Sequence, residues 1–112
     1  LEYRRVLFRS DSFRRDMSYH QGITWPWLLG VYYDSFKNII TVEKNATRKK
    51  KLEVQLKEFK NQVEKTFIKE FQEGKTIGGI HEIYDSKNPF EAKGAINQAW
   101  SVAEVFRIIL EN

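Results

Sequence analysis

The sequence predicts an all-α fold for a chain of 112 residues, which is enough for one small domain. Apolar side chains recur at spacings of three and four residues over 26–41, 46–73 and 96–110, as on the buried face of a helix. Most of the glycines instead lie in residues 74–94, which lack this period and are expected to form a long loop.

The first expected helix follows Thr24, a suitable N-cap, and tolerates Pro26 in its first turn. Apolar side chains cover much of its circumference: Trp27, Leu28, Val31, Tyr32, Phe36, Ile39 and Ile40. The helix over 96–110 is also apolar on nearly all sides. Helices of this kind are buried in the structure to which they belong.

The helix over 46–73 has one apolar stripe among mostly charged positions. The stripe consists of Leu52, Leu56, Phe59, Val63, Phe67 and Phe71. Gly74 follows as a stop signal. The lysines of this helix are then expected to form a solvated face rather than a binding patch. Because one surface helix cannot cover two apolar ones, we expect the chain to lack some of its packing partners.

The positive charge is separated from the aromatic residues along the chain. The net charge is +4 and the isoelectric point about 9.3, and the excess lies in residues 1–10 and 43–75. Nucleic-acid modules interleave aromatic and basic residues, so a nucleic-acid partner is not expected. No apolar run is long enough to span a bilayer. Without cysteines and with only 2 histidines, the chain is expected to hold no metal or other cofactor.

Residues 1–10 resemble the translation of a sequencing-library adapter, and the one methionine is Met17. We therefore expect residues 1–10 to be non-native and residues 11–112 to be a piece of a longer chain. The alternative is a native arginine-rich arm anchored by Leu7 and Phe8.

Three polar-aromatic segments lie at the ends of the apolar helices, over residues 19–27, 78–85 and 97–101. Aromatic faces pack on the C–H surfaces of sugars, and planar polar groups bond to sugar hydroxyls, so these segments favour a saccharide site. The candidate binding residues are His20, Gln21, Trp25, Trp27, Tyr84, Gln98 and Trp100. Glycoside hydrolysis needs two carboxyl groups, and Glu82 in its apolar surroundings is the candidate, with Asp85 nearby.

Each candidate also has a structural interpretation. Trp25 and Trp27 fill cores more often than they bind sugars. His20 is more often a hydrogen-bonding structural residue than a base, and Glu82 is more often a solvated or capping carboxylate. The residues alone therefore support an α-helical chain with a candidate saccharide cleft.

At the same segments the sequence resembles glycogen debranching enzymes. Residues 18–30, SYHQGITWPWLLG, are similar to their YHQGTVWPWL-G segment. Residues 79–85, GIHEIYD, are similar to their GSISEIFDG loop, and residues 94–105, GAINQAWSVAEV, to their GCIAQAWSVAEVLR helix. The order and spacing agree over residues 16–110.

This resemblance implies the C-terminal end of an (α/α)6 barrel of the six-hairpin glycosidase type, with inner helices at 26–41 and 96–110 and an outer helix at 46–73. It implies a cytoplasmic amylo-α-1,6-glucosidase that removes branch-point glucose from glycogen or limit dextrin with inversion. Glu82 would be the general base. The family's general acid, an Asp in an upstream Gly-Arg-Asp type motif, has no counterpart here. The chain alone is therefore expected to be inactive without the N-terminal part of the barrel.

The sequence departs from the family pattern at three places, which leaves the substrate subsites open. His81 replaces a serine, residues 86–88 replace a Gly-Asp stretch, and Asn97 replaces an alanine. Glucoamylase-like and trehalase-like barrels share the architecture and remain alternatives. A small basic helical interaction module built on residues 46–73 is the alternative from another class. Glutamates spread through that helix disfavour an anionic surface as its partner.

Overall fold

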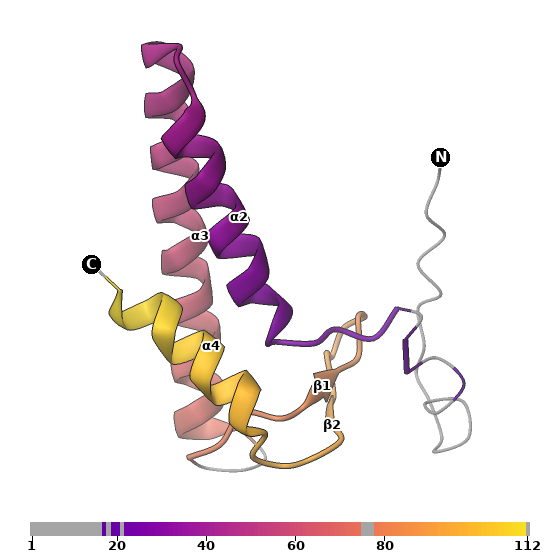
Figure 1. Cartoon of the computed structure of the whole chain (residues 1–112). Helices are drawn as coiled ribbons and strands as arrows, with labels where there is room; N and C mark the ends of the chain where they lie inside the picture. The colour runs from indigo at the N-terminus through magenta and orange to yellow at the C-terminus, as the bar shows by residue number, and fades with distance from the viewer. Residues whose placement is uncertain (1–16, 18, 21, 75–77, 112) are drawn as a thin grey trace.

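The computed structural model describes residues 17, 19–20, 22–74 and 78–111, so the expected adapter segment at 1–10 lies outside the described residues (Figure 1). This part of the chain is mainly helical, as predicted. Its elements are α2 (Leu28–Val42), α3 (Ala46–Glu73), β1 (Ile83–Tyr84), β2 (Ala92–Lys93) and α4 (Ala99–Leu110). None of the described helices is both long and apolar enough to cross a membrane.

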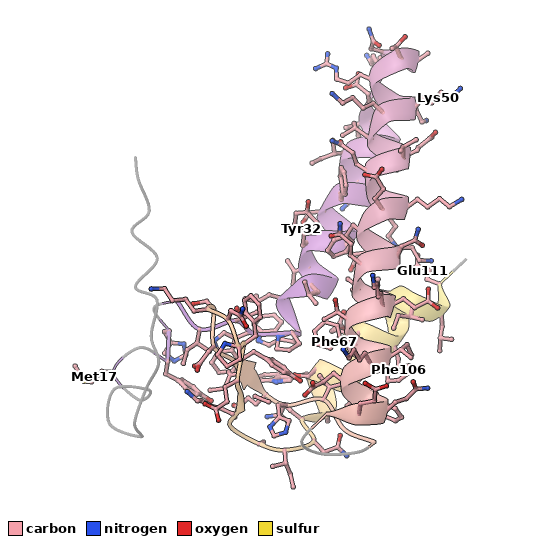
Figure 2. The ribbon with its side chains drawn as sticks, turned by 180° about the vertical axis from the view of Figure 1, so that it is seen from behind. Met17, Tyr32, Lys50, Phe67, Phe106 and Glu111 are labelled. Carbon is pink, nitrogen blue, oxygen red and sulfur yellow. The ribbon has the colours of Figure 1, made fainter. Side chains whose placement is uncertain are left out.

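The helix α3 has the predicted bounds. Asn45 caps its first turn, because its side-chain oxygen accepts a hydrogen bond from the Arg48 N–H at 2.9 Å. Gly74 ends the helix in extended backbone, with φ −66° and ψ 177°, so the helix stops there without the left-handed cap typical of glycine. Lys50 projects from the end of α3 that lies away from α4, which agrees with a solvated lysine face (Figure 2).

The other two helices begin later than the sequence predicted. The helix α2 starts at Leu28 after a tight turn, in which the Leu29 N–H bonds to the Pro26 carbonyl at 3.0 Å. Thr24 is not its N-cap, because the Thr24 backbone pairs with Tyr84 as an isolated β-bridge. The helix α4 starts at Ala99, since Gln98 is in extended backbone and its N–H bonds to the Ile80 carbonyl.

The three helices pack against one another around a small core. α2 and α3 run side by side as a helical hairpin, and α4 crosses the half of α3 nearer to β1 and β2 (Figure 1). The central buried side chains are Tyr33, Val63, Ile80, Val105 and Ile108. The predicted stripe of α3 supplies Val63 together with Leu56, Phe59, Phe67 and Phe71.

An ion-pair network joins α2 to α4. The Arg107 guanidinium donates two hydrogen bonds to Asp34, at 2.9 and 3.1 Å, and also binds Glu104 at 2.7 Å. The hydrogen bonds from Arg107 hold the pKa of Asp34 below its ordinary value. Because about half of the Asp34 side chain is exposed, this pair is expected to orient the helices more than it stabilises them.

One face of each apolar helix remains uncovered. On α2 this face consists of Leu28, Val31, Tyr32, Ile39 and Val42, and on α4 it includes Trp100 and Leu110. Val42 and Leu110 are 73% and 72% exposed. The expectation that α3 alone cannot cover both apolar helices is therefore met in the described part of the chain.

Residues 78–98 contain a β-hairpin, whereas the sequence predicted a loop without regular structure over residues 74–94. β1 and β2 pair antiparallel, with Ile83 opposite Lys93 and Tyr84 opposite Ala92. Thr24 extends this small sheet on the other side of β1, through two backbone hydrogen bonds of 2.9 Å to Tyr84. The hairpin thereby connects the segment before α2 to the segment before α4.

Candidate functional site

Glu82 lies immediately before β1, and two groups from different segments hold its carboxylate. The Tyr19 hydroxyl donates a hydrogen bond to Oε1, and the Ala95 N–H donates one to Oε2 at 3.1 Å. The Glu82 N–H in turn bonds to the Ala95 carbonyl at 2.9 Å. Both carboxylate oxygens therefore have a donor, and each retains a lone pair for a further one.

Gly94 closes the other side of the Glu82 side chain. Its φ is +73°, and a Cβ there would lie 2.5 Å from Glu82 Oε2 and 3.0 Å from Glu82 Cβ. Only glycine combines the left-handed backbone with this close approach. The position of the carboxylate is thus set by three segments: residues 19–20, the start of the hairpin and residues 94–95.

An aromatic cavity of about 310 Å³ lies where the segment before α2 meets α4. It is lined by His20, Gly22, Ile23, Trp25, Trp27, Leu28 and Trp100. The rings of Trp27 and Trp100 stack with centroids 5.6 Å apart, and Trp25 meets Trp100 edge-on at 6.3 Å. A cavity of this size, with aromatic walls and one imidazole, suits a small organic molecule such as a single sugar ring.

Tyr19 lies between the aromatic cavity and Glu82. Its ring packs edge-on against Trp25 with centroids 4.6 Å apart, and its carbonyl accepts a hydrogen bond from Trp25 Nε1 at 3.1 Å. Glu82 itself does not line the cavity but lies behind this tyrosine. Neither Tyr19 nor Gly94 was a candidate from sequence, although both lie in the segments that resemble the debranching enzymes.

The eight sequence candidates divide into distinct groups. His20, Trp25, Trp27 and Trp100 line the aromatic cavity, and Glu82 is connected to it through Tyr19. Gln98 is at the start of α4, where its side-chain oxygen accepts from the Ala99 N–H at 3.1 Å. Gln21 lies outside the described residues.

Tyr84 points away from the aromatic cavity, toward α3. Its hydroxyl donates to Glu70 at 3.2 Å and accepts from the His81 N–H at 3.1 Å. Burial raises the pKa of this phenol well above its ordinary value of 10.0, so the group is neutral. Tyr84 lines a separate cavity of about 340 Å³ beside Phe67 and Phe90, and its predicted contact with substrate stays a prediction.

The carboxylate of Asp85 forms an ion pair with Lys93 inside the hairpin. Its side chain is 2% exposed, and Lys93 Nζ donates to its two oxygens at 2.9 and 2.7 Å. This carboxylate therefore does not face Glu82 across a substrate. In the described residues no three His, Asp or Glu side chains are grouped as metal ligands.

Replacing Asp85 by asparagine should loosen the hairpin, because the largely buried ammonium of Lys93 would lose its two charged bonds to Asp85 and keep the longer contact of 3.9 Å with the more exposed Glu91. Removing one partner of a buried pair costs about 3 kcal/mol or more. Hydrogen exchange should become faster for residues 82–95 of the folded protein and stay unchanged in α3. The matched control, Asp34→Asn, removes an exposed ion pair and should have a much smaller effect. Equal exchange rates in the two variants would show that the Asp85 pair does not stabilise the hairpin.

Comparison with known proteins identifies the family of the chain that carries this site. A family model described as amylo-alpha-1,6-glucosidase matches residues 2–107. No curated protein matches the chain, and no solved structure does. The matched range includes the aromatic cavity, Tyr19, Glu82 and Gly94, and agrees with the resemblance seen in the sequence to the C-terminal domain of glycogen debranching enzymes. The chain therefore belongs to the amylo-alpha-1,6-glucosidase family.

Proposed function

We propose that the chain carries the general base of an inverting α-1,6-glucosidase, together with one wall of its glucose site. The observation that supports this most directly is the fixed carboxylate of Glu82, which Tyr19 connects to a cavity walled by three tryptophans. A general base must be ionisable, held in place and close to the sugar ring. Glu82 is held by two donors and is connected to the cavity wall through Tyr19, whereas Asp85 is paired with Lys93.

In the proposed reaction the aromatic cavity holds the terminal glucose of an α-1,6 branch. Glu82 removes a proton from a water molecule, whose oxygen forms the new bond to the anomeric carbon. The bond from that carbon to the glucan oxygen breaks, and a second carboxylic acid protonates the leaving oxygen. We assign that acid to the N-terminal part of the same domain. Glycogen and limit dextrin are the proposed substrates.

The exposed apolar faces of α2 and α4 support the proposal that further helices pack against this chain. Apolar patches of this kind are rare on monomers and mark surfaces that another element covers. In an (α/α)6 barrel, α2 and α4 would be inner helices and α3 an outer one. By itself the chain would then lack both the acid and most of the glucose site.

The test is a chimera in which residues 17–111 replace the matching segment of an active amylo-alpha-1,6-glucosidase. We expect the chimera to release glucose from limit dextrin, with the β-anomer formed first in proton NMR, and the isolated chain to release none. Trehalose and linear maltooligosaccharides should be poor substrates, which separates this proposal from the trehalase-like and glucoamylase-like alternatives. A folded chimera with no activity, release of the α-anomer, or an active isolated chain would overturn the proposal.

A further inference from the structure

Tyr19 is the described side chain that connects the aromatic cavity to the proposed base. Its hydroxyl donates to Glu82 Oε1, while its ring and its carbonyl are both held by Trp25, a residue of the cavity wall. We propose that Tyr19 is a positioning residue, which fixes the carboxylate of Glu82 for proton abstraction from water. This inference rests on the proposed role of Glu82.

The geometry explains why such a residue is needed. A glutamate side chain has several rotatable bonds, and ordering it in one rotamer costs conformational entropy. The Ala95 N–H restrains only Oε2, about which the carboxylate can still turn. The Tyr19 hydroxyl restrains Oε1 from the cavity side, so the two donors together define the plane of the carboxylate. An ordered base is what efficient proton transfer requires, since small displacements of catalytic groups reduce rates steeply.

Trp25 in turn fixes Tyr19. The indole N–H bonds to the Tyr19 carbonyl at 3.1 Å, and the two rings meet edge-on at 80°. His20 adds a second edge-on contact to the Tyr19 ring, with centroids 5.1 Å apart. Two residues that line the sugar cavity therefore hold the tyrosine whose hydroxyl reaches the base, which links the shape of the glucose site to the orientation of Glu82.

The experiment is Tyr19→Phe in the active chimera, which removes the hydroxyl and keeps the ring against Trp25 and His20. We expect kcat to fall about 10- to 100-fold, because the carboxylate loses one of its two restraints. KM should change by less than about twofold and the melting temperature should stay the same, since the cavity wall and the packing are retained. Tyr33→Phe, which removes a hydroxyl from the core between the helices and keeps its ring, is the matched control and should keep the kcat of the parent chimera.

A second comparison separates a failure of this inference from a failure of the proposed function. In a Glu82→Gln background, Tyr19→Phe should cause no further loss, because the two residues act as one unit. If Glu82→Gln is inactive while Tyr19→Phe keeps its kcat, Tyr19 is not a positioning residue but Glu82 remains the base. A fall in kcat, rise in KM and loss of stability together would indicate a structural role instead. Full activity of Glu82→Gln would overturn both proposals.

Discussion

Replacing Glu82 by glutamine in the active chimera should lower kcat for glucose release by about 10²- to 10⁴-fold, the contribution typical of a general base. KM should stay nearly constant, because Glu82 does not line the aromatic cavity that is proposed to hold the sugar. Glutamine has almost the same shape as glutamate, and its one oxygen can accept from the Ala95 N–H. Its NH₂ group can donate to the Tyr19 hydroxyl, so the local structure should survive. Initial rates on limit dextrin measure both constants.

Glu91→Gln is the matched control for this experiment. Glu91 lies in the same hairpin and is exposed. Its backbone carbonyl accepts a hydrogen bond from the Asp85 N–H at 3.0 Å, and the substitution leaves this bond unchanged. We expect it to keep the activity of the parent chimera. Retention of activity in Glu82→Gln would place the base elsewhere. Equal losses in the two variants would indicate that any lost charge in the hairpin impairs the enzyme.

The periodicity of the helices predicted most of the fold. α3 has its expected bounds because its apolar stripe and its stop signal, Gly74, agree with each other, and the structure adds the Asn45 cap at its start. The starts of α2 and α4 were predicted two or three residues early, because Thr24 forms backbone hydrogen bonds with Tyr84 of the hairpin and Gln98 forms one with Ile80, before the hairpin. These long-range bonds join residues about 60 and 18 positions apart, and local propensity contains no information on them.

The aromatic part of the site could be predicted from the sequence, but its exact membership could not. Tryptophans and a histidine in motifs at the ends of two helices indicated a cavity, and His20, Trp25, Trp27 and Trp100 form one. Tyr84 is not among the residues that line this cavity, because its hydroxyl bonds to Glu70 of α3, and its contact with substrate stays a prediction. The role of Tyr19 depends on a contact 63 positions away along the chain, which spacing alone does not reveal.

Replacing Gly94 by alanine should lower kcat of the chimera by about 100-fold or more, although residue 94 bears no reactive group. The new Cβ would lie 2.5 Å from Glu82 Oε2, 3.0 Å from Glu82 Cβ and 3.1 Å from Ile83 Cγ1. Glu82 Cβ and the fully buried Ile83 cannot move without a shift of the hairpin, so the carboxylate should be displaced from its place. A displacement of about 1 Å is enough to reduce a rate about 100-fold. Steady-state kinetics on limit dextrin provide the measurement.

Backbone strain has to be separated from this displacement, because alanine is also disfavoured at a φ of +73°. Gly78→Ala provides the matched control: its φ is +82°, but a Cβ at this position would have no atom of the described residues within 4 Å. Each variant should lose about 1 kcal/mol of stability from the left-handed backbone, which a lower melting temperature would report. Only Gly94→Ala should lose activity at temperatures where both proteins are folded. Similar kcat values in the two variants would mean that the close approach of Gly94 to Glu82 has no catalytic role. A selective loss in Gly94→Ala would show that the carboxylate must be held where Tyr19 and Ala95 place it.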